Sequence, residues 1–208
     1  MKKKILIIGD NSTAKWHQMS PFDELLKKLL HEYEVTISTN YSDFQINELI
    51  NYDVCISLVD QWIPLNESET FGILTYVFNG GGLLMIHQGI SLQARDELAL
   101  LARGKFIQHP EQCILEYQPI PNSHEIVNNV EAFSSKEEPY QCILDHIVKT
   151  NVFMEYKLED TVYAAGWCHS YGIGKVVYLS PGHNLETFKN PMYQKVIQNS
   201  INWLLNPI

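Results

Sequence analysis

Short apolar runs alternate with amphipathic stretches along the first half of the chain. The runs are too apolar to be half-exposed strands and are typical of strands buried on both faces; they cover residues 4–8, 35–38, 52–58 and 83–86. Apolar residues at helical spacing lie between them, at 21–31, 44–50 and 67–78. This alternation of strand and helix predicts a parallel, doubly wound sheet with right-handed crossovers.

The second half of the chain has a different pattern. A helical stretch at 96–101 precedes a series of strand-like segments with short connections, at 113–118, 142–148, 151–156, 162–167 and 175–179. Short connections favour antiparallel pairing. Residues 119–140 are rich in loop-forming residues, and residues 191–205 form an amphipathic closing helix. We therefore expect one α/β domain over residues 1–208, with a mostly parallel sheet and an antiparallel extension from the second half.

Length and charge limit the classes of partner. A chain of 208 residues is suited to one domain. The net charge of −9, from 15 basic and 24 acidic residues, disfavours nucleic acid, whose binding needs a basic surface. The basic residues 2–4 are followed by too few apolar residues for a signal peptide or a membrane span. We expect a cytoplasmic protein whose partner is a small molecule, and self-association into a homo-oligomer is left open.

Two histidines follow apolar strands directly. His87 comes after the run at 83–86, and His183 follows the run at 175–179 after Gly182. Ligands of open α/β sheets bind outside the carboxyl ends of the strands. Because parallel strands end at one edge, we expect both imidazoles, and Gln88 beside His87, to lie in one pocket. The alternative for His87 is a histidine that only satisfies backbone hydrogen bonds, and the alternative for His183 is a surface ion pair.

Further candidates lie in loops that can reach the same edge. Asp10, Trp16 and His17 follow the first strand, and an aromatic ring among polar groups is suited to a sugar. Trp16 could equally pack onto the first helix. Glu186, three residues after His183, could orient that imidazole, or could form a surface ion pair.

Glu138, Tyr140 and His109 complete the candidate set. Glu138 could enter the pocket as an acid and Tyr140 as a hydroxyl donor, although acidic loop residues are usually solvated. His109 precedes Pro110, so a local turn is an equal alternative. His87, His109 and His183 with Glu138 would offer ligands for zinc or a similar divalent ion. The sequence has no short metal motif such as His-Glu-x-x-His, so the cofactor stays unknown.

The four cysteines include no Cys-x-x-Cys pair. Cys168 lies beside His169, which leaves a cysteine-dependent hydrolase as a third functional alternative. Adjacent residues of a strand point to opposite faces, and this argues against a Cys–His pair there.

Four motifs together resemble the ThuA-like (trehalose-utilisation) family. They are the glycine-rich strand ending in histidine at 80–87, the Gly-x-Phe-x-x-His-Pro segment at 104–110, the His-x-Ile and acidic Glu-x-Tyr segments within 124–140, and the closing strand with its Gly-His motif at 174–183. Glu125 stands where the family has proline, and Lys175 where it has arginine.

The resemblance implies a flavodoxin-like fold of the class I glutamine amidotransferase-like superfamily. At the elbow where true amidotransferases carry a cysteine, this chain has His87, so we expect no glutaminase activity. The implied function is an enzyme of carbohydrate metabolism that acts on a sugar or an oxidised sugar by acid/base chemistry of His87, His183 and Glu138. The alternative is a non-catalytic carbohydrate- or metabolite-binding protein on the same scaffold.

Overall fold

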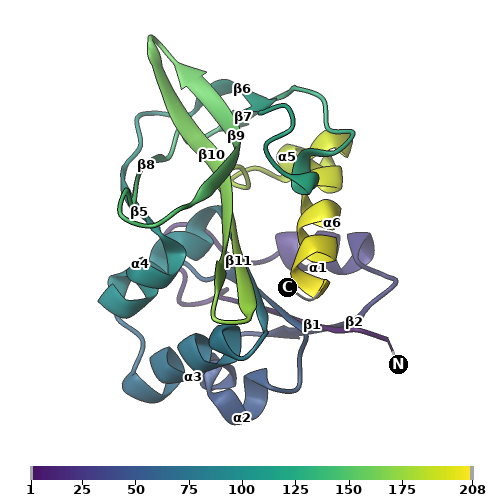
Figure 1. Cartoon of the computed structure of the whole chain (residues 1–208), viewed down its shortest axis with the longest axis vertical. Coiled ribbons are helices and arrows are strands. Elements are labelled where there is room, and N and C mark those ends of the chain that lie inside the picture. Colours follow the sequence, from purple (N-terminus) through teal and green to yellow (C-terminus); the bar gives the residue numbers. More distant parts are fainter. Residues whose placement is uncertain (1, 207–208) are drawn as a thin grey trace.

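The computed structural model describes residues 2–206. Within them, a large sheet runs through the molecule between two layers of helices (Figure 1). The elements of the first half are β1 (Lys4–Gly9), α1 (Phe22–Leu29), β2 (Glu34–Ser38), η1 (Tyr41–Phe44), α2 (Ile46–Leu49), β3 (Val54–Leu58), α3 (Glu67–Phe78), β4 (Gly82–Ile86), η2 (His87–Ala94) and α4 (Asp96–Ala102). Those of the second half are β5 (Gly104–Gln108), β6 (Cys113–Pro119), η3 (Glu125–Val127), β7 (Phe133–Glu137), β8 (Gln141–Leu144), β9 (Asn151–Leu158), β10 (Thr161–Tyr171), β11 (Gly174–Leu179), α5 (Leu185–Lys189) and α6 (Pro191–Leu205).

The sheet has a parallel half and an antiparallel half. Among the described residues its strand order is β2-β1-β3-β4-β11-β10-β9-β6-β7. Strands β2, β1, β3, β4 and β11 are parallel, and each later neighbour is antiparallel to the one before it. The order 2-1-3-4 is that of flavodoxin-like folds, in which ligands bind beyond the carboxyl ends of the strands. The predicted fold class, a parallel α/β sheet with an antiparallel extension, is confirmed.

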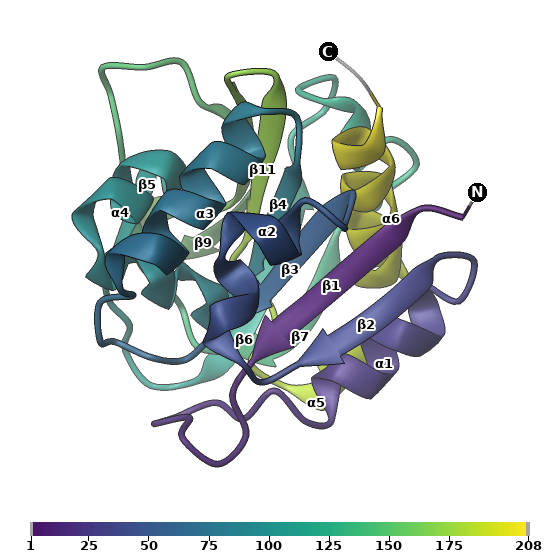
Figure 2. The same ribbon diagram turned by 90° about the horizontal axis from the view of Figure 1, so that it is seen from below.

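Alternate residues of each buried strand pack into two separate hydrophobic cores, one on each face of the sheet. Ile5 and Ile7 of β1 pack with α1, α5 and α6, whereas Leu6 and Ile8 pack with η1 and with helices α2, α3 and α4. Figure 2 shows these two helical layers on opposite sides of the strands. The first core continues into the extension through buried residues of β6, β7 and β9. This shared core fixes the end of β7, and with it Glu138, relative to the parallel strands.

Capping explains why two helices have their predicted bounds. Asn66 accepts a hydrogen bond from the backbone N–H of Glu69, and the Glu69 side chain bonds back to Asn66, which forms a capping box at the start of α3. Asn190 caps α6, with Pro191 at the first helical position. These short-range signals lie entirely within the local sequence.

Short edge elements differ from prediction. The loop-rich segment 119–140 contains strand β7, and β5 pairs with β8 in a small second sheet. The predicted strand at 142–148 ends at Leu144, and α5 was missed. These elements have five residues or fewer, so their periodicity is too brief to identify. None of the helices in residues 2–206 combines the length and apolar character needed to cross a membrane.

Candidate functional site

His87 occupies a strained turn directly after β4. Its backbone φ is 46°, in the left-handed region that residues with a side chain rarely adopt, and η2 begins at the same residue. The side chain is fully buried. A strained strand-to-helix turn of this kind is how a nucleophile elbow presents its side chain above a sheet. The chain therefore has such an elbow, and it presents an imidazole.

Two glycines allow the loops around this elbow to pack closely. A Cβ on Gly89 would lie 2.2 Å from the backbone oxygen of Ser57 on β3. Gly182 has a φ of 142°, and a Cβ there would lie 3.1 Å from the Cβ of His87. Because β11 lies parallel beside β4, the loop after β11 brings His183 to the same edge. The ring centroids of His87 and His183 are 5.5 Å apart, so the expected juxtaposition is present.

Glu137 at the end of β7 holds the loop that carries His183. Its carboxylate is fully buried and accepts the backbone N–H of His183 at 2.9 Å and of Asn184 at 3.4 Å, together with the Thr187 hydroxyl. The sequence analysis considered Glu186 for a role beside His183. The structure does not bring Glu186 into the site. Its side chain lies on the exposed face of α5 and pairs with Lys189 at 2.7 Å.

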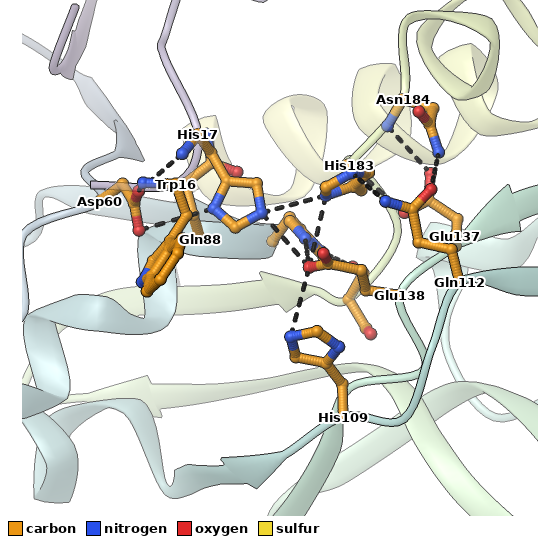
Figure 3. A network of polar contacts seen from close by, with 12 residues as sticks. Trp16, His17, Asp60, Gln88, His109, Gln112, Glu137, Glu138, His183 and Asn184 are labelled. Atoms are coloured by element: carbon orange, nitrogen blue, oxygen red, sulfur yellow. Dashed lines mark hydrogen bonds and ion pairs between the residues drawn. The ribbon is translucent and has the colours of Figure 1, made fainter. Parts of the chain in front are cut away.

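Glu138 is the centre of the site. Its Oε2 lies 3.2 Å from Nε2 of His17, 3.3 Å from Nδ1 of His183 and 3.7 Å from Nε2 of His109 (Figure 3). The same oxygen lies 3.4 Å from Nε2 of His87. These four imidazoles come from the loops after β1, β4, β11 and β5. One carboxylate oxygen therefore faces ring nitrogens from four separate segments. We call His17, His87, His183 and Glu138 the histidine–carboxylate cluster.

Asp60, which sequence analysis did not select, positions His17. It follows β3, is 1% exposed, and its Oδ2 accepts the backbone N–H groups of Trp16 at 2.5 Å and His17 at 2.6 Å. Its Oδ1 lies 3.5 Å from Nδ1 of the His17 ring. The signal that could have found Asp60 is the one used for His87: a polar residue just beyond a buried apolar strand.

The surroundings give the imidazoles different protonation states. Nδ1 of His87 lies 2.7 Å from the carbonyl oxygen of Ser180, which can only accept, so Nδ1 holds the proton and Nε2 faces Glu138. Burial lowers the pKa of His87, against the contact with Glu138. Burial also acts to lower the pKa of His17, but hydrogen bonds and charges of Asp60 and Glu138 raise it to about 9. A charged imidazole and a neutral one thus lie with ring centroids 5.1 Å apart.

Glu138 itself stays ionised. Burial alone would raise the pKa of its carboxyl group, but hydrogen bonds with His17 and His183 hold this pKa well below its usual range. The cluster therefore contains a fixed negative charge at its centre.

A cavity of about 450 Å³ opens beside the cluster. It is lined by Lys15, Trp16, His17, Trp62, Phe106, His109, Glu138 and Tyr140. The Tyr140 ring stacks on His87 with centroids 4.0 Å apart, and on His109 at 5.5 Å. Trp62 donates its indole N–H to Asp60 at 3.3 Å. The cavity therefore has aromatic walls with charged and imidazole groups on one side.

Most of the predicted site residues meet here, and two of the remaining ones have local roles. Trp16, His17, His109, Glu138 and Tyr140 line the cavity, with His87 and His183 behind them. Gln88 is buried under the elbow, 3.5 Å from the carbonyl oxygen of Leu58. Asp10 is also buried and does not line the cavity: it accepts the hydroxyl groups of Thr13 and Tyr41 and so shapes the loop after β1.

Cys168 does not support a cysteine-dependent hydrolase. Its side chain is 1% exposed in the core, and burial raises the pKa of its thiol to about 12. A thiol is a nucleophile only as the thiolate, which this environment disfavours at neutral pH.

Fold and site together define a flavodoxin-like α/β protein with a histidine–carboxylate cluster at the carboxyl edge of its parallel strands. The family model for trehalose utilisation, ThuA, matches residues 4–204. The chain therefore belongs to the ThuA family, as its motifs indicated, and this membership supports a role related to trehalose utilisation. No curated protein matches the sequence.

Solved structures share the fold at low sequence identity. A ThuA-like protein of Bacteroides uniformis is 19% identical, with a TM-score of 0.79, over 97% of this chain and 91% of that one. A ThuA-like protein of Parabacteroides merdae is 14% identical, with a TM-score of 0.79, over 99% and 91%. A cytoplasmic protein of Salmonella typhimurium is 17% identical, with a TM-score of 0.65, over 98% and 99%. At such identities the likeness shows the fold alone.

Proposed function

We propose that this protein is a cytoplasmic enzyme that acts on a sugar or an oxidised sugar by moving protons at the histidine–carboxylate cluster. One observation carries the proposal: the cluster and the aromatic cavity are continuous. His17 and Glu138 belong to both, and His109 contacts Glu138 from the cavity wall. A ligand in the cavity would therefore lie against the ionised and imidazole groups.

The cavity is suited to a sugar ring in size and lining. Ligand sites have volumes of about 300–1,000 Å³, and this cavity falls within that range at about 450 Å³. A sugar ring has C–H groups on its faces and hydroxyl groups around its edge. Trp16 and Trp62 offer flat apolar faces with a polar N–H edge, while Lys15 and Glu138 can bind hydroxyl groups. The family description, trehalose utilisation, supports the same class of ligand.

The cluster contains both forms of imidazole that proton transfer requires. An oxidised sugar has a carbonyl group, which acidifies the neighbouring C–H bond. The bare Nε2 of His87 could take that proton, passed on from the cavity wall, and the Glu138 carboxylate beside it would stabilise the imidazolium that forms. His17, whose pKa is raised to about 9, could donate to the carbonyl oxygen. This pairing of base and acid is general acid–base catalysis.

Hydrogen exchange measures this chemistry directly. With the protein in D₂O, NMR should show deuterium replacing hydrogen next to the carbonyl of an oxidised glucoside or an oxidised trehalose, and no exchange in the parent sugar. His31→Ala is the control, because His31 is exposed at the end of α1, away from the cavity. Exchange that is absent from the wild type, or equal in wild type and Glu138→Gln, would remove the proposal.

A non-catalytic sugar-binding protein is the alternative, and the aromatic cavity by itself is compatible with it. A substitution of His87, which lies behind the cavity wall, distinguishes the two functions. For an enzyme, His87→Asn should abolish turnover and leave the sugar Kd within a few-fold of wild type. Calorimetric binding of the sugar with no exchange or product in either protein would favour the binding function.

The imidazole at the elbow also predicts that the protein releases no ammonia from glutamine. Hydrolysis of an amide by this scaffold needs a thiolate at the elbow, and the position is occupied by His87. Purified protein assayed with glutamine should give the background rate. Ammonia release that disappears in His87→Asn and persists in His31→Ala would contradict this prediction.

A further inference from the structure

One buried ring nitrogen of the cluster, Nε2 of His87, has no hydrogen-bond partner. Nδ1 of His87 donates to the Ser180 carbonyl, so Nε2 carries a lone pair, and it is unpartnered in a fully buried side chain. It faces Oε2 of Glu138 at 3.4 Å, which is also an acceptor. Two lone pairs that face each other away from water repel unless a proton or a cation lies between them.

The spacing of the four side chains matches the coordination shell of one small ion. Each offers one ligand atom, and all four atoms lie within 4.8 Å of one another. Ligands about 2.1 Å from a tetrahedral ion are about 3.4 Å apart. Glu138 Oε2 lies 3.2, 3.4 and 3.3 Å from the nitrogens of His17, His87 and His183, and the His17 and His183 nitrogens are 3.0 Å apart.

The opposite nitrogen of each ring faces a polar partner. Metal-bound histidines almost always direct their second ring N–H to a carboxylate, a backbone carbonyl or water. Nδ1 of His17 faces Asp60 at 3.5 Å, and Nδ1 of His87 donates to the Ser180 carbonyl. Nε2 of His183 contacts the Gln112 amide nitrogen at 2.7 Å, and turning this amide over presents its oxygen instead. Such partners orient the inner nitrogens toward Glu138.

His109 does not belong to this set. Its Nε2 is 3.7 Å from Glu138, its Nδ1 contacts the backbone oxygen of Pro110 at 2.9 Å, and its side chain is 35% exposed. The sequence analysis grouped His109 with His87, His183 and Glu138 as candidate ligands. The structure puts His17 in that place, which leaves His109 at the cavity wall.

We propose that His17, His87, His183 and Glu138 bind one divalent transition-metal ion. Three imidazoles and one carboxylate gathered this closely favour Zn²⁺. The site adjoins the cavity of the proposed function, but ion binding requires neither a sugar nor turnover. With the ion bound, His17, His87 and His183 all hold it, and His109 is the imidazole left free to exchange protons with a ligand in the cavity.

Metal titration of the purified 208-residue chain tests the proposal. After treatment with a chelator and dialysis, the wild type should bind one Zn²⁺ per chain, and Co²⁺ should give the visible absorption of a tetrahedral site. His183→Ala and Glu138→Gln should weaken Zn²⁺ affinity on the order of a hundredfold or more. Asp60→Asn, which removes a partner that orients His17, should cost about 10–100-fold.

Two variants serve as controls for the ligand set. His31→Ala and His109→Ala should keep the wild-type affinity and the Co²⁺ spectrum. Wild-type protein without a stoichiometric ion, or equal affinity in wild type, His183→Ala and Glu138→Gln, overturns the proposal. Loss of the ion in His109→Ala with retention in His17→Ala overturns the ligand set. Melting curves in chelator check that each variant folds, and Glu138→Gln preserves the side-chain shape if His183→Ala does not fold.

The outcomes also separate this inference from the sugar chemistry. Binding of an ion that depends on these four residues, with no hydrogen exchange on any oxidised sugar, would support the metal site and contradict the proposed function. Exchange on an oxidised sugar by a wild-type protein that binds no stoichiometric ion would support the proposed function and contradict the metal site.

Discussion

Replacing His87 or His183 by alanine is expected to lower turnover of the sugar substrate on the order of a hundredfold or more, the range for a positioned acid or base. The double variant should lose little more than either single one, because residues that act as a unit are not additive. Both contact the same oxygen of Glu138, at 3.4 and 3.3 Å, so either loss disables the same group. The result is expected whether they exchange protons or hold an ion.

Steady-state kinetics of the two single variants, the double variant and His31→Ala measure this coupling. His87 has a φ of 46°, which strains alanine, so His87→Asn is the matched variant: asparagine adopts this backbone region more readily. The prediction fails if either folded single variant retains full turnover. It also fails if the losses multiply in the double variant, because the two histidines would then act independently.

His169 is expected to make the protein less stable in mild acid. It lies in β10 with 5% of its surface exposed, and burial, assisted by the charge of Arg103, lowers its pKa to about 4. In the unfolded chain an imidazole titrates near pH 6.5. Between pH 6.5 and 4 the unfolded state therefore binds a proton that the folded state does not. The free energy of unfolding should fall by about 3 kcal/mol as the pH is lowered through this window. Above pH 6.5 the imidazole is neutral in both states and no stability is lost.

Urea unfolding at pH 7 and at pH 4.5 measures the effect in wild type and in His169→Gln, which cannot titrate. The wild type should lose about 2–3 kcal/mol more than the variant between these two values. Taking the difference between the two proteins cancels other groups that titrate in the same range, including His87. Equal losses in the two proteins would show that His169 protonates as easily when folded as when unfolded.

Part of the site could be read from local sequence because it depends on the ends of buried strands. The apolar runs before His87 and His183 identify β4 and β11, and the two strands lie side by side in parallel. Their following residues must then meet at one edge. The same reasoning accounts for His17 after β1, and it would have found Asp60 after β3 had it been applied to that strand.

Glu138 shows where local reasoning stops. In sequence it resembles any solvated acidic loop residue, and its neighbour Glu137 looks the same. Pairing of β7 with β6, and of β6 with β9, carries this segment back to the parallel strands and buries Glu137 completely. Sequence distance misleads in the opposite case: Glu186 is three residues from His183, but α5 turns it toward solvent and Lys189.

Local sequence was sufficient to predict the parallel strands, the helices with strong caps such as α3 and α6, the imidazole at the elbow and the family. Each of these depends on burial or backbone preference within a short window. Three features required the folded chain: Glu138 lies among the histidines, His17 rather than His109 joins His87 and His183, and Asp10 and Glu186 stay outside the cavity. Those outcomes depend on which distant segments pack together, since His17 and Glu138 are 121 positions apart in the sequence and the pairing of the sheet and its shared core bring them together.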